Sequence, residues 1–210
     1  MKGLKQIFPW VAVAVMLWAV IGRSEVREIS AINDVAGISV DPGEGGNYTF
    51  GLEVAVPAKE GAFTVKSKVI SVQAKSLSEA LRQAGLQSEY PATLTHGSLV
   101  VLNRRFLSED LRKISKILLE DWQGQMRPWI AVATECDAAE ILKRNERENL
   151  RAGLLSAQLR RAAAAGNIQT EDGISLCSRL LAGETVSLAA IVPSEEGYRI
   201  DGSVSVKGGN

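Results

Sequence analysis

The sequence predicts an α+β protein of the mixed α/β kind, in which one domain follows an N-terminal apolar segment. Three observations lead to this fold class: alternating β-type runs flank a glycine-rich turn, short continuously apolar runs alternate with helical periodicity, and two alternating runs close the chain. We expect a mixed β-sheet packed by about three helices. A chain of 210 residues is long enough to bury a core without metal or disulfide support.

The first residues have the layout of a secretory signal. Lys2 and Lys5 precede the apolar run Ile7–Ile21, and Gly22 and Arg23 follow it. A helix of about 15 residues spans only about 22 Å, whereas the hydrocarbon core of a bilayer is roughly 30 Å thick. A signal sequence cut at Gly22 is therefore favoured, while an uncleaved anchor stays open because a bilayer can thin around a short span.

The basic residues before the apolar run predict a cytoplasmic N-terminus, so the rest of the chain would lie outside the cytoplasm. We divide the chain into a signal sequence or membrane anchor over residues 1–24, a domain over residues 25–206, and a disordered tail over residues 207–210.

Seven segments of the domain have the composition of β-strands. Two of them flank Asp41–Asn47, where a proline and three glycines supply turn dihedrals, so a β-hairpin is expected there. Two others are short and continuously apolar, which is typical of strands covered on both faces, and a helix between them predicts a parallel crossover. The seven segments are Val35–Val40, Tyr48–Val56, Thr64–Ala74, Ser98–Asn103, Trp129–Thr134, Thr185–Val192 and Tyr198–Val206.

Polar residues mark three helix starts. Ser76 and Asp137 are each followed three residues later by a glutamate, the spacing of a capping box. Ser108 is expected to cap a helix whose leucine and isoleucine residues recur every three or four positions. The helix after Asp137 is expected to continue to Ala165, with its arginines on the solvated face.

The composition argues against nucleic-acid and metal binding. Lysine plus arginine and aspartate plus glutamate number 24 each, so no broad basic field would attract nucleic acid. Cys136 and Cys177 have no neighbouring cysteine or histidine at zinc-site spacing. Outside the cytoplasm the two cysteines could form a disulfide, and the sequence leaves this alternative and two separate thiols open.

The sequence also lacks a recognisable catalytic set. His96 is the single histidine, and Ser98 lies too close to it in sequence for a nucleophile elbow. Gly43–Gly46 joins two expected strands and lacks the helix and lysine of a phosphate loop. We therefore expect no enzyme and no catalytic, cofactor-binding or metal residues, with a hydrolase built on His96 as the last alternative.

Several motifs, taken in order, resemble the N-terminal domain of the spore germination receptor C-subunit family, Ger(x)C. Arg27-Glu28-Ile29 and the strand ending at Asp41 resemble the mature start of that family. The further matching segments are His96–Leu102, Phe106–Leu111, Trp129–Ala133, Ala138–Leu142 and Gly197–Gly202.

This resemblance implies a non-catalytic mixed α/β domain that works with transmembrane A-type and B-type subunits in the response to nutrient germinants. Arg23 stands where the family has its lipid-accepting cysteine, so no lipid attachment is expected and the membrane would be reached through an uncleaved segment or through partners. Family members continue into further domains, and the chain is expected to cover about the first half of a usual member.

The function that follows is a membrane-associated extracytoplasmic receptor subunit that supports spore germination by protein contacts and needs no cofactor. Its expected location is the outer face of the cell membrane or of the inner spore membrane, with a secreted form if the signal is cut. The alternative is a free-standing extracytoplasmic interaction or small-ligand-binding domain that has lost the receptor role.

Overall fold

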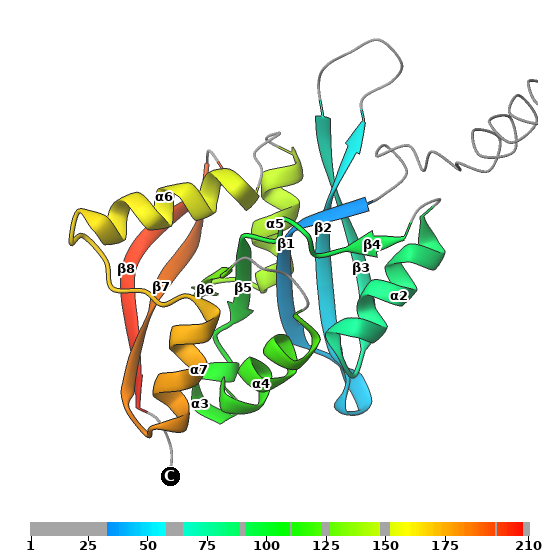
Figure 1. Cartoon of the computed structure of the whole chain (residues 1–210). Helices are drawn as coiled ribbons and strands as arrows, with labels where there is room; N and C mark the ends of the chain where they lie inside the picture. Colours follow the sequence, from blue (N-terminus) through cyan, green and yellow to red (C-terminus); the bar gives the residue numbers. More distant parts are fainter. Residues whose placement is uncertain are drawn as a thin grey trace, which may run out of the picture. The chain divides into compact units, whose positions relative to one another are not determined.

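A mixed sheet of eight strands carries the fold (Figure 1). The computed structural model describes residues 33–57, 65–88, 91–109, 111–122, 127–147, 152–195 and 197–207, so the predicted signal or anchor with Gly22 and Arg23 lies outside the described residues. The strands are β1 Asn33–Pro42, β2 Tyr48–Pro57, β3 Val65–Ala74, β4 Ala92–Thr93, β5 Leu99–Asn103, β6 Trp129–Ala133, β7 Thr185–Ser194 and β8 Gly197–Lys207.

The centre of the sheet is parallel and both of its ends are antiparallel. The strand order is β3-β2-β1-β5-β6-β7-β8, with β4 pairing beside the start of β1. Strands β1, β5, β6 and β7 run parallel, while β2 and β3 extend one end and β8 extends the other as antiparallel neighbours. The predicted parallel crossover between the two short apolar strands is confirmed, and every residue of β5 is buried.

The predicted turn between the first two strands is confirmed as well. It contains the short 3-10 helix η2, Glu44–Gly46, in which Gly45 and Gly46 adopt φ values of 62° and 79°. Residues with a Cβ rarely adopt such positive values, which explains the glycines at this point. The segment reverses the chain from β1 into β2.

Helices pack on both faces of the sheet. One hydrophobic cluster joins the sheet to α2, α4 and α7, and a second joins the other face of β5 and β6 to α5 and α6. The result is a sheet between two helical layers, which confirms the predicted α+β class. The helices are α2 Leu77–Gln87, α3 Phe106–Glu109, α4 Leu111–Asp121, α5 Ala138–Arg147, α6 Ala152–Ala164 and α7 Gly173–Leu181.

Two of the predicted helix starts have different outcomes. The Ser76 hydroxyl accepts a hydrogen bond from the Glu79 amide at 3.2 Å, and Glu79 accepts one in return from the Lys75 amide at 3.1 Å, so this cap is confirmed. The predicted cap at Ser108 is wrong, because the chain becomes helical two residues earlier and Ser108 lies inside α3.

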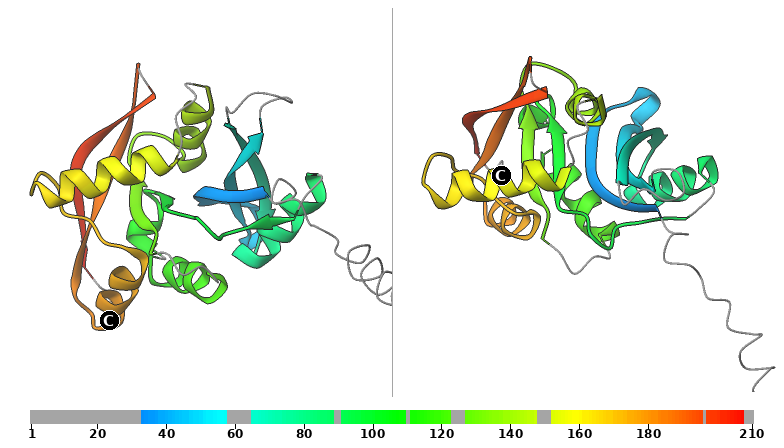
Figure 2. Two further views of the ribbon diagram at one scale, coloured as in Figure 1. Left: turned by 45° about the horizontal axis from the view of Figure 1, so that its top comes forward. Right: turned by 90° about the horizontal axis from the view of Figure 1, so that it is seen from above.

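The single long helix predicted up to Ala165 is also wrong. Helices α5 and α6 occupy this stretch and run in clearly different directions (Figures 1 and 2). The buried carboxylate of Glu53 on β2 accepts hydrogen bonds from the Ala152 amide at 3.0 Å and 3.2 Å, which fixes the start of α6 on the sheet. A contact across 99 residues overrides the local helical pattern.

Helix α7 was not predicted. Asp172 caps it by accepting hydrogen bonds from the amides of Ile174 and Ser175, both at 2.9 Å, and Leu176 and Leu180 are buried four residues apart.

Lys207, which the sequence assigns to the tail, pairs with Thr185 as the last residue of β8, and residues 208–210 lie outside the described ranges. Within the described ranges, no helix has both the length and the apolar character needed to cross a bilayer.

Candidate functional site

A buried carboxylate joins the end of β1 to the start of α5. Asp41 is only 6% exposed, and its Oδ1 accepts hydrogen bonds from the Ala138 amide and from the Asn103 side chain, both at 2.7 Å. Its Oδ2 accepts a bond from the Ala139 amide at 2.8 Å. Asp41 therefore satisfies two of the amides that the first turn of α5 leaves without a helical partner.

Asn103, at the end of β5, extends this network. Its side-chain amide also donates to Asp137 at 3.0 Å, and its carbonyl oxygen accepts a bond from the Arg105 amide at 3.0 Å. Asp137 directly precedes α5, as the capping prediction requires, but the Glu140 amide bonds to the Asp137 backbone carbonyl at 3.0 Å, and Asp41 binds the amides of Ala138 and Ala139. The network fixes both loops that leave β5 and β6.

An open pocket of about 980 Å³ lies beside these two loops. Its lining comes from three segments. They are the end of β5 with the residues after it (Asn103, Arg104, Arg105 and Leu107), Thr134–Asp137 after β6, and Val204–Lys207 at the end of β8. The helices after β5 and β6 pack on opposite faces of the sheet. In open α/β sheets, ligands usually bind at the carboxyl ends of neighbouring strands where the connections diverge in this way.

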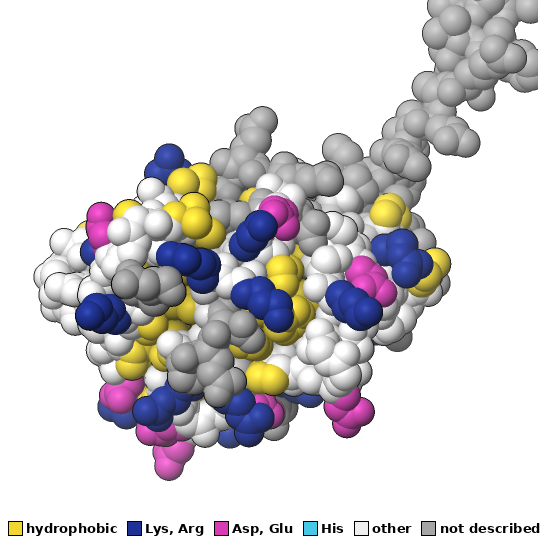
Figure 3. Space-filling model, turned by 90° about the horizontal axis from the view of Figure 1, so that it is seen from below, with side chains coloured by type: hydrophobic (Ala, Val, Ile, Leu, Met, Phe, Trp, Pro, Cys, Tyr) yellow, Lys and Arg dark blue, Asp and Glu magenta, His cyan; other side chains and the backbone are white. Residues whose placement is uncertain are grey.

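The exposed groups of this pocket are charged and aliphatic. Arg104, Arg105 and Lys207 provide cations, Glu135 and Asp137 provide carboxylates, and the apolar lining consists of Leu107, Val204 and Val206. Figure 3 views the molecule from the side on which β8 ends in Figure 1, and lysine and arginine side chains surround exposed hydrophobic groups there. Such a surface suits binding of a polar or extended ligand.

The one thiol in the pocket is poorly suited to be a nucleophile. Burial, followed by the negative charge of Glu140, raises the pKa of Cys136 to about 11. The thiol is therefore protonated at neutral pH, and the thiolate is the reactive form. Burial also raises the pKa of Cys177, and both cysteines are free thiols, so the structure does not contain the disulfide that the sequence left open.

Alkylation should report the state of Cys136 directly. Because its pKa lies near 11, we expect the iodoacetamide reaction rate at Cys136 to rise about tenfold per pH unit from pH 7 to pH 10. Peptide mass spectrometry of a Cys177→Ser variant isolates this site, and the urea-unfolded chain provides the unperturbed reference. A rate that levels off below pH 9 in the folded protein would contradict the assignment.

His96 lies outside the pocket, in the turn between β4 and β5. Its Nδ1 lies 2.7 Å from Asp34 Oδ2, and its backbone amide donates to Asp34 Oδ1 at 3.2 Å. The Ser98 hydroxyl donates to the Ala36 carbonyl at 3.4 Å and not to the imidazole. Within the described part of the chain, His96 therefore tethers the turn to β1 and has no hydrogen-bonded nucleophile.

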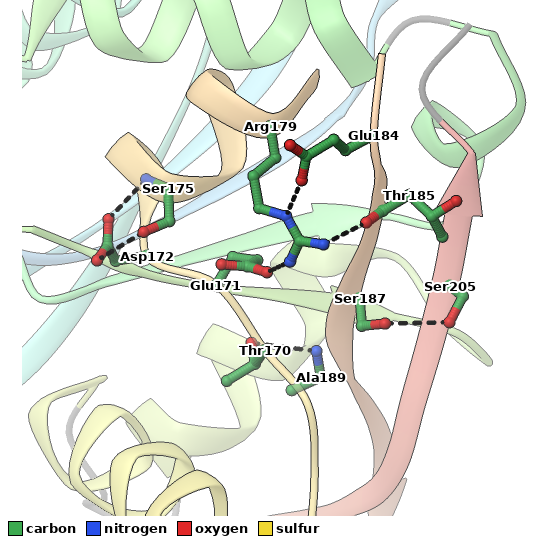
Figure 4. Close-up of polar contacts among 10 residues, drawn as sticks. All are labelled: Thr170, Glu171, Asp172, Ser175, Arg179, Glu184, Thr185, Ser187, Ala189 and Ser205. Carbon is green, nitrogen blue, oxygen red and sulfur yellow. Dashed lines mark hydrogen bonds and ion pairs between the residues drawn. The ribbon is translucent and has the colours of Figure 1, made fainter. Parts of the chain in front are cut away.

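A second polar cluster surrounds Arg179 on α7 (Figure 4). Its guanidinium donates to Glu171, to Glu184 at 3.0 Å and to the Thr185 carbonyl at 2.7 Å. The hydrogen bonds with Glu184 and Glu171 raise the pKa of Arg179 further above its usual range. The cluster ties both ends of α7 to the start of β7, which gives it a structural role.

Thr170 adds a further link in this region. Its hydroxyl donates to the Ile130 carbonyl of β6 at 2.9 Å. It also accepts a bond from the Ala189 amide of β7 at 3.2 Å (Figure 4). It therefore bridges the two strands where their direct pairing begins.

Loss of the Arg179 contacts should loosen this corner of the fold. In an Arg179→Gln variant we expect faster amide hydrogen exchange in α7 and in the first residues of β7, because three contacts of one side chain disappear together. Arg199→Gln, which removes a single exposed pair with Asp201, is the matched control. Equal exchange in the two variants would show that the cluster does not hold α7 in place.

The described residues thus define a mixed α/β domain whose buried polar groups are used to fix loops and helices and whose open charged pocket suits binding. The family model of the spore germination protein N-terminal domain matches residues 25–193. The chain therefore belongs to this family of spore germination proteins, which confirms the resemblance seen in its motifs. Neither the curated proteins nor the solved structures contain a match to the chain.

Proposed function

We propose that the protein is a membrane-associated, extracytoplasmic subunit of a nutrient germinant receptor. The observation that carries this proposal is the family match over residues 25–193. Membership gives a germination-related role, and membrane association is part of the proposal. Beyond family membership, we propose that the protein acts through contacts with transmembrane A-type and B-type subunits.

The location of the domain is part of the same proposal. The basic residues before the apolar run support a domain over residues 25–206 on the outer face of the cell membrane or inner spore membrane. Residues 1–24 act as a signal sequence or anchor. Because Arg23 cannot accept a lipid in place of cysteine, the retained segment or the partner subunits hold the protein at the membrane.

The side chains of the described domain support a non-enzymatic mode of action. The thiol in the pocket is protonated at neutral pH because the pKa of Cys136 is raised to about 11, and the imidazole of His96 is bound to Asp34 without a nucleophile. Asp41 and Asn103 use their polar atoms to hold α5 and the loops. In this proposal the protein acts by contributing surfaces to an assembly, without a cofactor.

Crosslinking in dormant spores of the native host tests this proposal. A chain tagged after Asn210 is crosslinked in isolated inner membranes, purified under denaturing conditions and analysed by mass spectrometry. We expect A-type and B-type receptor subunits among the crosslinked products. A tagged, unrelated protein of the same membrane is the control, and equal recovery of these subunits with both baits would contradict the receptor role.

A second candidate function is a free-standing extracytoplasmic interaction or small-ligand-binding domain. The observation that favours it is the open pocket with Arg104 and Lys207 at its wall. In this case the chain would be absent from crosslinked receptor complexes, and deletion of its gene would leave nutrient-triggered germination unchanged.

A further inference from the structure

Strand β8 forms one edge of the sheet, and none of the described strands lies beside its outer side. Its backbone pairs with β7 on one side, and no other described element forms backbone hydrogen bonds with it. The pairing is regular over the last five residues, from Ser203 opposite Ala189 to Lys207 opposite Thr185. An unpaired edge of this length presents a row of donors and acceptors that can bind another strand.

The pocket runs along this edge. Successive side chains of a strand point to opposite faces of its sheet, so a pocket confined to one face would contact every second residue. Val204, Ser205, Val206 and Lys207 all line the pocket, although they are consecutive. The pocket therefore opens onto the edge of β8, where the backbone groups are accessible.

The charges and apolar groups beside the edge define the occupant. The three cations of the lining, Arg104, Arg105 and Lys207, outnumber its two carboxylates, Glu135 and Asp137. Arg104 and Lys207 are exposed and form no ion pair with another described residue. Val204 and Val206 are partly exposed and suit β-branched side chains of a neighbouring strand. A strand with acidic residues at alternate positions matches both features.

We propose that the outer edge of β8 binds an extended, acidic segment of a partner polypeptide, which adds to the sheet as a further strand. Backbone hydrogen bonds to Ser203–Lys207 supply affinity, while Arg104 and Lys207 select acidic side chains. This inference names the surface through which the proposed receptor subunit contacts a partner. It takes from the proposed function only that the partner is a polypeptide.

The test uses peptides of stated composition and the full purified chain. The probe is a fluorescein-labelled, C-terminally amidated hexapeptide of alternating glutamate and valine, and its binding is followed by fluorescence polarisation. Two peptides serve as controls: one with lysine in place of glutamate, and one of the original sequence N-methylated at every residue. We expect both to bind at least about tenfold more weakly, a loss of about 1.4 kcal/mol.

Protein variants then locate the site. Arg104→Glu and Lys207→Glu should each weaken binding of the acidic peptide about tenfold or more. Arg160→Glu makes the same charge change on exposed α6, away from the pocket lining, and should leave binding unchanged. Amide exchange measured with and without peptide should show new protection within residues 203–207 and none in β3 at the opposite edge.

Any one of four results would overturn the proposal. Absence of binding by the acidic peptide would show that the edge does not accept strands. Equal binding of the N-methylated peptide, or an equal loss in Arg160→Glu, would show non-specific charge attraction. Concentration-dependent dimerisation that Val204→Lys abolishes, without peptide binding, would make a second copy of the chain the occupant. The receptor role stays intact in each case, because crosslinking to A-type and B-type subunits tests it separately.

Discussion

The Asp41→Ala variant should lose about 3 kcal/mol of unfolding free energy, because three hydrogen bonds to a buried carboxylate disappear at once. The buried amides of Ala138 and Ala139 would lose their acceptor, and the Asn103 side-chain nitrogen would keep only its bond to Asp137. Urea denaturation of the purified protein, followed by circular dichroism, measures the change. Hydrogen exchange should accelerate first at the start of α5.

Asp34→Ala is the matched control, since it removes a carboxylate from the same strand. Asp34 bonds to exposed His96, and a pair of this kind contributes at most about 1 kcal/mol. If Asp41→Ala were no more destabilising than Asp34→Ala, the buried network would not hold α5 on the sheet.

The Gly37→Ala variant should be destabilised by about 2 kcal/mol through overpacking. A Cβ at Gly37 on β1 would lie 2.4 Å from the Cβ of Ala152, the first residue of α6. The start of α6 must then move away from the sheet, which also strains the bonds between the Ala152 amide and Glu53. Thermal and urea unfolding of the purified variant measure the loss.

A second substitution makes this prediction specific. Ala152→Gly removes the opposing Cβ and alone should cost up to about 1 kcal/mol through helix propensity. The loss of unfolding free energy in the double variant should be smaller than the sum of the two single losses by about 1 kcal/mol or more, because the clash is absent. Strict additivity would show that Gly37 is required for another reason.

Local signals in the sequence were sufficient for much of the sheet. The β1–β2 hairpin follows from a turn whose positive φ values only glycine adopts easily. The burial of β5 follows from its uninterrupted apolar run. The cap at Ser76 depends on neighbours three residues apart, so it is visible without knowledge of the fold. These features are decided by short-range sterics and by burial pattern.

Long-range contacts explain the errors among the helices. The break between α5 and α6 depends on Glu53, which lies far away in sequence. Helix α7 had a detectable signal in Asp172 and the leucine pair that follows, and this signal was missed.

The candidate site was only partly accessible from sequence. Asp41 and Asn103 each end an apolar strand with a polar residue, but they meet because β1 and β5 pair in parallel, and only the parallel order of β5 and β6 was predicted. The participation of β8 could not be predicted, because the wall formed by Val204–Lys207 depends on how the hairpin of β7 and β8 lies beside the loops after β5 and β6. The family could be predicted because its motifs recur in order along the chain.

Fractionation of dormant spores from the native host tests the receptor account most directly. The tagged chain is sought in the inner membrane and soluble fractions, and its mature N-terminus is determined by mass spectrometry. The account predicts recovery in the inner membrane, with residues 1–22 retained if the N-terminal segment is the anchor. Soluble protein beginning at Arg23, or absence of the protein from spores, would contradict a membrane-bound receptor subunit and favour a free-standing domain.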